Sequence, residues 1–171
     1  IPQAGVSIPA ETLRNFWRMC AHLNGQLFNA SQIGQALGGM SHTTIGRYLD
    51  LFVDTMMLRR LEPFFANLGK RLVKSPKVYV RDSGLVHALL NIPDKETLLS
   101  HPVVGQSWEC HVMENLLVCA GDRAQGYFYR TSGGAEIDLL LAWPDGSLWA
   151  VEIKRSLTPK VERGFHAACD D

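Results

Sequence analysis

The chain has 171 residues and a net charge of zero, with 46% hydrophobic and 20% charged residues. This length can bury one large core or two small ones, and the composition is that of an ordinary globular protein. A neutral chain has no overall positive field for nucleic acid, so a basic binding surface would have to be local. No apolar run is long enough to span a membrane, and four cysteines without paired spacing favour a reducing, cytoplasmic setting over a zinc site.

The first third of the chain predicts three helices, the last two in a helix-turn-helix layout. Apolar residues recur at helical spacing in three segments, and cap or stop residues lie at their ends. The predicted helices cover residues 7–23, 32–37 and 41–56. A glycine turn at residues 38–40 separates the last two helices, and Ser41 is placed to cap the longer one.

Two strands, at residues 57–62 and 77–81, are expected to complete a winged helix. Hydroxyls and an arginine on the exposed start of the third helix suit contacts with phosphates or bases, and a basic cluster near the wing suits a nucleic-acid backbone. The predicted nucleic-acid-binding residues are Ser41, Thr43, Thr44, Arg47, Lys70, Arg71, Lys74 and Lys77. Winged helices also dock proteins, so a protein-docking role is the alternative.

Residues 91–102, with two prolines and mixed polarity, are predicted to link a domain of residues 1–90 to a domain of residues 103–171. The second domain is expected to contain a last helix over residues 158–168, with a proline in its first turn.

The second domain should begin with a helix over residues 103–119. Its spacing predicts that Glu109 borders the core-facing side and that Glu114 lies in solvent. A carboxylate beside an apolar face is costly unless it is paired or bound to a metal ion. The residues expected to face the core are Val104, Trp108, Val112, Leu116 and Cys119.

A β-hairpin is predicted near the C-terminus, and it carries two carboxylates. Alternation in its first strand places Asp138 on one face and three aliphatic residues on the other, namely Ile137, Leu139 and Leu141. The Pro-Asp-Gly sequence at residues 144–146 is a turn signal. A three-residue loop there sets Asp138 directly opposite Glu152, with Lys154 on the same face as Glu152.

Two carboxylates and an ammonium at one point can hold a divalent cation and stabilise charge at a phosphate. Opposed carboxylates repel each other in a plain hairpin, which favours a cation between them. The predicted metal ligands are Asp138, Glu152 and Glu109, with Mg²⁺ or Mn²⁺ as the ion. Lys154 would orient the nucleophile or stabilise the transition state. The alternative is a solvated strand face on which Lys154 neutralises one carboxylate.

The motifs of the second domain resemble those of the PD-(D/E)XK nuclease superfamily. They are Gly105-x-x-x-Glu109, Tyr127-Phe128-Tyr129-Arg130, Glu136-x-Asp138 and Val151-Glu152-Ile153-Lys154. Two more, Ser75-Pro76-Lys77-Val78-Tyr79 and Asp82-Ser83-Gly84-Leu85, make the chain similar to the domain of unknown function at the C-terminus of many predicted prokaryotic AAA+-type ATPases.

The resemblance implies a winged-helix domain followed by a restriction-endonuclease-like α/β domain that is truncated at its C-terminus. It places Asp138, Glu152, Lys154 and Glu109 in the catalytic positions. The implied function is that of a nucleic-acid-associated fragment of an ATPase, with a Mg²⁺-dependent nuclease-like site acting on DNA or RNA.

No phosphate-loop motif occurs in the sequence, so the resemblance implies that the ATPase domain, which would bind ATP, lies upstream of this chain. A non-catalytic DNA-binding or protein-docking regulatory module is the alternative function.

Overall fold

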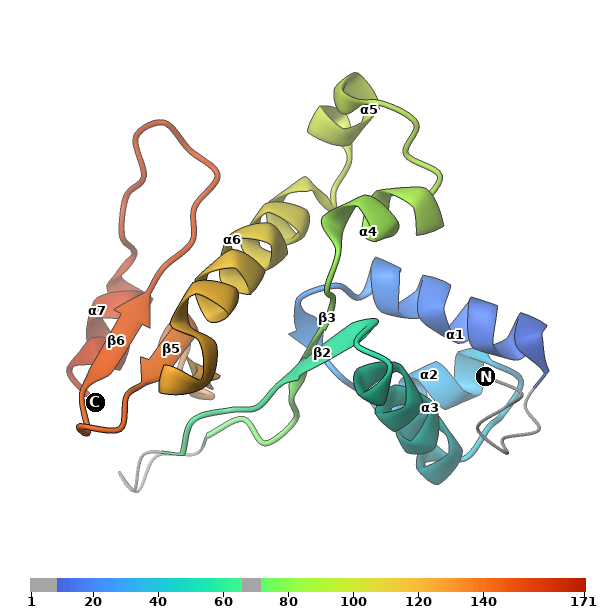
Figure 1. Ribbon diagram of the computed structural model, residues 1–171, viewed down its shortest axis with the longest axis horizontal. Coiled ribbons are helices and arrows are strands. Elements are labelled where there is room, and N and C mark those ends of the chain that lie inside the picture. The colour runs from blue at the N-terminus through green and yellow to red at the C-terminus, as the bar shows by residue number, and fades with distance from the viewer. Residues whose placement is uncertain (1–8, 66–71) are drawn as a thin grey trace.

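The computed structural model describes residues 9–65 and 72–171, which form a mixed α/β fold with two small antiparallel sheets (Figure 1). Seven α-helices occur in this described part: α1 (Ala10–His22), α2 (Ala30–Ala36), α3 (His42–Asp54), α4 (Ser83–Leu89), α5 (Lys95–Ser100), α6 (Val104–Ala120) and α7 (Arg163–Cys169). The strands are β1 (Gln26–Leu27), β2 (Leu58–Leu61), β3 (Lys77–Val80), β4 (Gln125–Arg130), β5 (Glu136–Ala142) and β6 (Leu148–Val151).

The predicted helix-turn-helix segments are observed as α2 and α3. Ser41 caps α3 as predicted, because its Oγ accepts a hydrogen bond of 3.1 Å from the Thr44 backbone N–H. Between the helices, Gly38 and Gly39 both adopt a φ of +83°, a conformation that L side chains rarely adopt. The predicted start of the first helix at residue 7 lies outside the described residues, and α1 is seen from Ala10.

The first sheet has the strand order β1-β3-β2, and it confirms the two strands predicted for the wing. Strand β2 pairs antiparallel with β3, with Leu58 opposite Val80 and Leu61 opposite Lys77. Helices α1 and α3 pack on this sheet, and a hydrophobic cluster that includes Phe16 fills the space between them.

The second sheet has the strand order β4-β5-β6 and is covered by a helix on each face. Helix α6 packs on one face, where Met113 and Leu139 belong to the same hydrophobic cluster, and α7 packs on the other face. The predicted hairpin register is confirmed, because Leu139 lies opposite Val151. The backbone N–H of Trp143 donates to Ser147 O at 2.9 Å, which closes the predicted three-residue loop.

A β-bulge in β5 breaks the predicted alternation. Tyr127 lies opposite Leu140 and Tyr129 lies opposite Ile137, so two residues of β5, Asp138 and Leu139, face the single residue between the tyrosines. The prediction that three aliphatic residues share a face was therefore wrong. Ile137 packs on the α7 side of the sheet, whereas Leu139 packs on the α6 side.

Helix α6 is rotated from the prediction. Two residues expected in the core, Trp108 and Cys119, are exposed, whereas Glu114, expected in solvent, is buried. Glu114 accepts hydrogen bonds from Arg59 of β2 and, at 3.0 Å, from Arg81 after β3. These two arginines offset the cost of burying the carboxylate and fix the orientation of the helix.

The last helix is shorter than predicted. Helix α7 begins at Arg163, whereas the prediction placed its start at Thr158. The Thr158 backbone N–H donates to Ser156 Oγ at 3.2 Å, a local turn that competes with helix formation.

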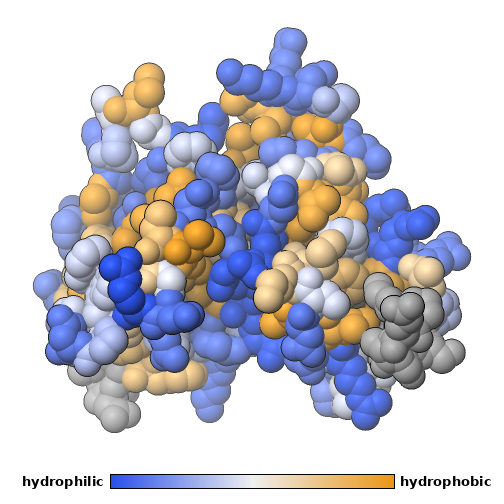
Figure 2. All heavy atoms as spheres, viewed as in Figure 1, coloured by the Kyte–Doolittle hydropathy of each residue, from blue (hydrophilic) through white to orange (hydrophobic). Residues whose placement is uncertain are grey.

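The segment predicted as a linker contains helix α5. The half of the chain before this segment contacts the half after it. Leu61 and Tyr79 from the first sheet share a hydrophobic cluster with Cys110 of α6 and Phe128 of β4. A backbone hydrogen bond also joins the segment after β2 to β4, since Phe64 N donates to Phe128 O at 2.7 Å. In the view of Figure 2, hydrophilic side chains lie across the middle of the molecule, with hydrophobic groups on either side. The boundary at residues 91–102 stays a prediction.

None of the helices in the described part of the chain combines the length and the apolar character needed to cross a membrane.

Candidate functional site

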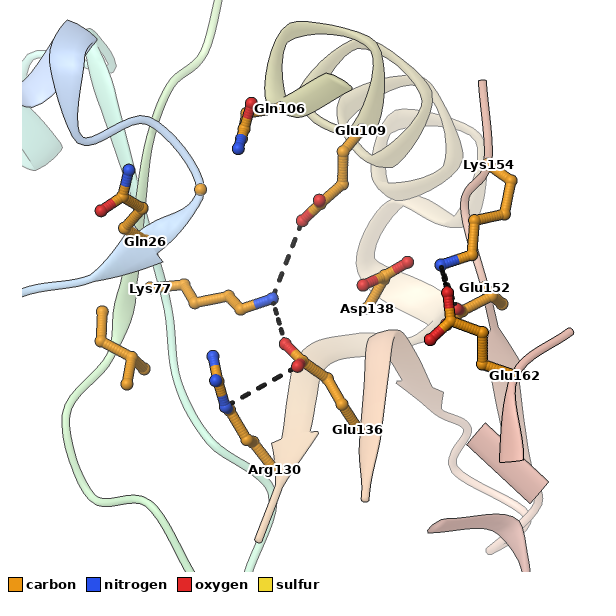
Figure 3. A pocket seen from close by; sticks show the side chains of 12 residues that line it. Gln26, Lys77, Gln106, Glu109, Arg130, Glu136, Asp138, Glu152, Lys154 and Glu162 are labelled. Atoms are coloured by element: carbon orange, nitrogen blue, oxygen red, sulfur yellow. Dashed lines mark hydrogen bonds and ion pairs between the residues drawn. The ribbon is translucent and has the colours of Figure 1, made fainter. Parts of the chain in front are cut away.

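A polar pocket of about 450 Å³ lies where β1, β3, α6 and the second sheet meet (Figure 3). The structure brings the four predicted catalytic residues together in its lining. Five carboxylates and three cations line the pocket: Glu109, Glu136, Asp138, Glu152, Glu162, Lys77, Arg130 and Lys154. When all are ionised, the lining carries two more negative charges than positive ones.

Asp138 reaches the pocket because of the bulge, which turns both Asp138 and Leu139 to the α6 side of the sheet. The paired part of β6 ends at Val151, and the Asp138 carboxylate accepts a hydrogen bond of 2.9 Å from the Ile153 backbone N–H. The Asp138 side chain thus holds the segment that follows β6 and places Glu152 beside the bulge. In the view of Figure 3, Asp138 lies between the ammonium groups of Lys77 and Lys154.

Glu152 is paired with Lys154, whose Nζ lies 2.8 Å from Glu152 Oε1 and 3.4 Å from Glu162 Oε1. Burial raises the pKa of Glu152 and the negative charge of Asp138 raises it further, while Lys154 opposes both. The hydrogen bond to Glu152 raises the pKa of Lys154, so the ammonium stays charged.

Glu109 enters the pocket from α6 and is held by the first sheet. The Tyr79 hydroxyl donates to Glu109 Oε1 at 2.6 Å, and Lys77 Nζ lies 3.8 Å from the same oxygen. Burial raises the pKa of Glu109, an effect that Lys77 opposes and Asp138 reinforces. Burial and the adjacent Glu109 charge also raise the pKa of Tyr79, which keeps the phenol protonated as a donor.

Lys77 and Arg130 approach Glu136 from two different strands. Lys77 Nζ lies 2.9 Å from Glu136 Oε1, and Arg130 Nε lies 3.7 Å from Glu136 Oε2. Lys77 was predicted to follow a nucleic-acid backbone together with Lys74, but its side chain is only 5% exposed and points into the pocket. Lys74 is exposed.

The other predicted nucleic-acid-binding residues lie on the first half of the chain. Ser41, Thr43 and Arg47 are exposed at the start and on the side of α3, and Thr44 is half-buried beside Ser41. Lys70 and Arg71 lie outside the described residues. Of the described residues in this group, none lines the pocket.

The oxygen ligands in the pocket suit a hard divalent cation, and one such ion would balance the excess negative charge of the lining. In the described residues, no three acidic, histidine or cysteine side chains converge closely enough to hold a metal ion. Instead of pointing at a shared ion position, Glu152 is paired with Lys154 and Glu109 with Lys77. The donor set therefore fits Mg²⁺ or Mn²⁺ in chemistry, and binding requires the carboxylates to turn from the lysines toward the ion.

Tyr79, Arg130 and Glu136 were missed by the sequence analysis as site residues. Signals in the sequence could have found Tyr79 and Glu136. Tyr79 lies two residues after Lys77 on β3, and Glu136 lies two residues before Asp138.

The chain is similar to two mycobacterial proteins. It is 42% identical over all of its 171 residues to the uncharacterized protein Mb2031c of Mycobacterium bovis and to the uncharacterized protein Rv2008c of Mycobacterium tuberculosis. The chain spans 38% of the length of each relative. No solved structure matches the chain.

Two family models match different parts of the chain. Residues 104–171 match a family described as Domain of unknown function (DUF4143). Residues 1–96, more than half of the chain, match a second model. The chain therefore belongs to the family described as Domain of unknown function (DUF8612).

Proposed function

We propose that the pocket is a Mg²⁺- or Mn²⁺-dependent site for cleaving phosphodiester bonds in nucleic acid, within a larger ATPase. The observation that supports this proposal most is the convergence of Asp138, Glu152, Lys154 and Glu109 in one pocket from three separate elements. The segment after β6 and helix α6, whose Glu109 lies 29 residues before Asp138, thus present their charged groups to the same pocket.

In this proposal Asp138, Glu152 and Glu109 are the oxygen ligands that would hold the ion. The ion, when bound, would supply charge neutralisation at the phosphate and an acidified water. Lys154 lies at the edge of the carboxylates with its ammonium charged, so it can donate hydrogen bonds to the attacking water or to a phosphate oxygen. Tyr79 positions Glu109 through its hydroxyl.

The first half of the chain would act as a winged helix that presents nucleic acid to the pocket. The exposed start of α3 and the exposed Lys74 support this part of the proposal. An ATPase domain would lie in the part of the longer protein outside this chain, as expected from the resemblance and compatible with the greater length of the mycobacterial relatives.

Metal-dependent stabilisation tests the site. Millimolar Mn²⁺ should raise the melting temperature of the wild-type chain, because the ion binds the folded site and relieves the repulsion between the carboxylates. Asp138→Asn should remove this rise while keeping the melting temperature in metal-free buffer. Asp145→Asn is the matched control, since Asp145 lies in the exposed turn of the same hairpin and bonds to Ser147. An unchanged melting temperature of the wild type in Mn²⁺ would reject the metal site.

Cleavage is tested separately with labelled single-stranded and duplex DNA and with RNA. The proposal predicts Mn²⁺-dependent cleavage of at least one substrate, and Lys154→Met should reduce its rate about 100-fold or more, the typical effect of losing a charged group that acts in the transition state.

A non-catalytic binding or regulatory module is the second candidate function. The ion pairs of Glu152 with Lys154 and of Glu109 with Lys77 favour it, because the lysines already neutralise two of the proposed ligands. This module should bind nucleic acid or a protein equally well in EDTA and in Mn²⁺.

A further inference from the structure

A single carboxylate, Glu136, lies between two cations that come from different strands. Glu136 is the first residue of β5, Arg130 is the last residue of β4 and lies opposite it in the ladder, and Lys77 begins β3. The distances are 2.9 Å from Lys77 Nζ and 3.7 Å from Arg130 Nε, each to a different oxygen of Glu136 (Figure 3).

The three side chains differ in their exposure. The Lys77 side chain is 5% exposed, while those of Glu136 and Arg130 are 33% and 42% exposed. A buried ammonium needs an anion beside it, so Lys77 must always have a partner. Glu136 can move into solvent by rotating its side chain, whereas Lys77 cannot. The carboxylate is therefore the replaceable member of the group.

Removing Glu136 from this position would not disturb the sheet. The pairing of Glu136 with Arg130 in the ladder is made by backbone groups, which do not depend on the side chains. A charged lysine and an arginine that share one anion also match the oxygens of a phosphodiester, because arginine donates two bonds in a fixed fork and lysine donates from a point charge.

We propose that Lys77 and Arg130 form a subsite for a backbone phosphate of a nucleic acid, and that Glu136 occupies this subsite in the free protein and is displaced when the strand binds. The inference rests on the proposed function for the identity of the ligand. It goes beyond that function by assigning a phosphate position next to Asp138 and an internal competitor for it.

Fluorescence anisotropy with a fluorescein-labelled single-stranded DNA oligonucleotide tests the subsite. The measurement is made in the presence of Ca²⁺, a hard cation that the carboxylates of the pocket can bind. Glu136→Gln should bind the oligonucleotide about tenfold more tightly than wild type, because the phosphate no longer competes with the Glu136 carboxylate for Lys77 and Arg130. Lys77→Met and Arg130→Met should each weaken binding about tenfold.

The matched control is Glu162→Gln, which removes another carboxylate from the same pocket. Glu162 lies 3.4 Å from Lys154, but Lys154 remains paired with Glu152 at 2.8 Å, so no cation is released. The affinity of this variant should change less than about twofold, the effect of one exposed charge. An equal gain in both glutamine variants would show a general charge effect and overturn the subsite.

The double variant Glu136→Gln/Lys77→Met makes the test specific. The gain from Glu136→Gln should shrink markedly in this background, because the two residues compete for one position. If Lys77→Met does not fold, Arg130→Met gives the same comparison, since the Arg130 side chain is far more exposed than that of Lys77. An unchanged or weaker affinity of folded Glu136→Gln, including no detectable binding, overturns the inference.

The inference and the proposed function fail in different ways. A gain in Glu136→Gln without any effect of Mn²⁺ on the wild-type melting temperature would support the phosphate subsite and reject the metal site. Mn²⁺-dependent cleavage without a gain in Glu136→Gln would support the site and reject the displacement of Glu136.

Discussion

Glu109 is held in a position that costs stability when it is ionised. Burial and Asp138 raise its pKa, and Tyr79 and Lys77 only partly compensate. Glu152 is in a similar position, with burial as the largest cause. Two carboxylates kept in an unfavourable setting at one pocket are typical of a functional site, where the arrangement is retained for chemistry at the expense of the fold.

The pH dependence of stability tests this interpretation at Glu109. A carboxyl whose folded pKa is raised stabilises the fold fully below its usual pKa of 4.5, and that contribution is lost as pH rises through the folded value. Glu109→Gln removes the loss, so the variant should be more stable than wild type at pH 7.5, by about 1 kcal/mol or 2–4 °C in Tm. The difference should vanish near pH 4.

Melting curves of both proteins in EDTA from pH 4 to pH 8 provide the measurement. The control is Glu96→Gln, which makes the same substitution at an exposed residue of α5 outside the pocket. A Glu109→Gln variant that is less stable than wild type at pH 7.5 would show that the Tyr79 and Lys77 contacts outweigh the cost of burial.

At the scale of elements, the turn between α2 and α3 closes directly over Gly34. The backbone N–H groups of Gly39 and Met40 donate to Gly34 O at 3.0 and 2.9 Å. A Cβ at Gly34 would collide with the backbone oxygen of Met40, whereas a Cβ at Gly46 on α3 would meet no atom within 4 Å. Gly34 and Gly46 are therefore helical glycines with opposite structural requirements.

Gly34→Ala should therefore destabilise the chain by about 2 kcal/mol, because the backbone of the turn must move to admit the methyl group. Gly46→Ala should instead stabilise it by about 0.5–1 kcal/mol, since alanine loses less entropy in a helix. Urea unfolding of the two variants and wild type measures both effects. Equal effects of the two substitutions would contradict the close approach of the turn to α2.

The elements that the sequence predicted well are those set by local chemistry. The Ser41 cap, the glycine turn and the Pro144–Gly146 loop depend on residues a few positions apart, so their signals are complete in the sequence. The bulge at Asp138 was not predictable in this way, because it depends on how β5 is matched to a different strand, β4. Part of the candidate site therefore followed from the turn, and part of it required the fold.

The orientation of α6 shows the same limit at the scale of the whole molecule. Apolar spacing alone turned Glu114 toward solvent, and the fold buries it because Arg59 and Arg81 arrive from strands more than 30 residues earlier. The pocket depends on the same long-range contacts, since Lys77 and Tyr79 belong to the first sheet while Asp138 and Glu152 belong to the second half. A site shared in this way needs both halves held in one arrangement.

Glu114 is a charged residue that links the two halves through two arginines, and its replacement tests whether the halves unfold together. Glu114→Gln keeps the side-chain volume but removes the negative charge that pairs with two partly buried arginines. The loss should lower the free energy of unfolding by about 2–3 kcal/mol. The control is Asp50→Asn, which breaks an exposed ion pair with Arg60 and should cost less than 1 kcal/mol.

Native-state hydrogen exchange followed by mass spectrometry reads the two halves separately, through the amides of α1 and those of β5. The shared cluster of Leu61, Tyr79, Met113 and Phe128 predicts that the most protected amides of both elements report one free energy of unfolding. Glu114→Gln should lower that free energy equally in both, because opening either half exposes the same cluster. If only the β5 amides respond, residues 91–102 separate two units that unfold independently, and the pocket between them forms by docking of two stable domains.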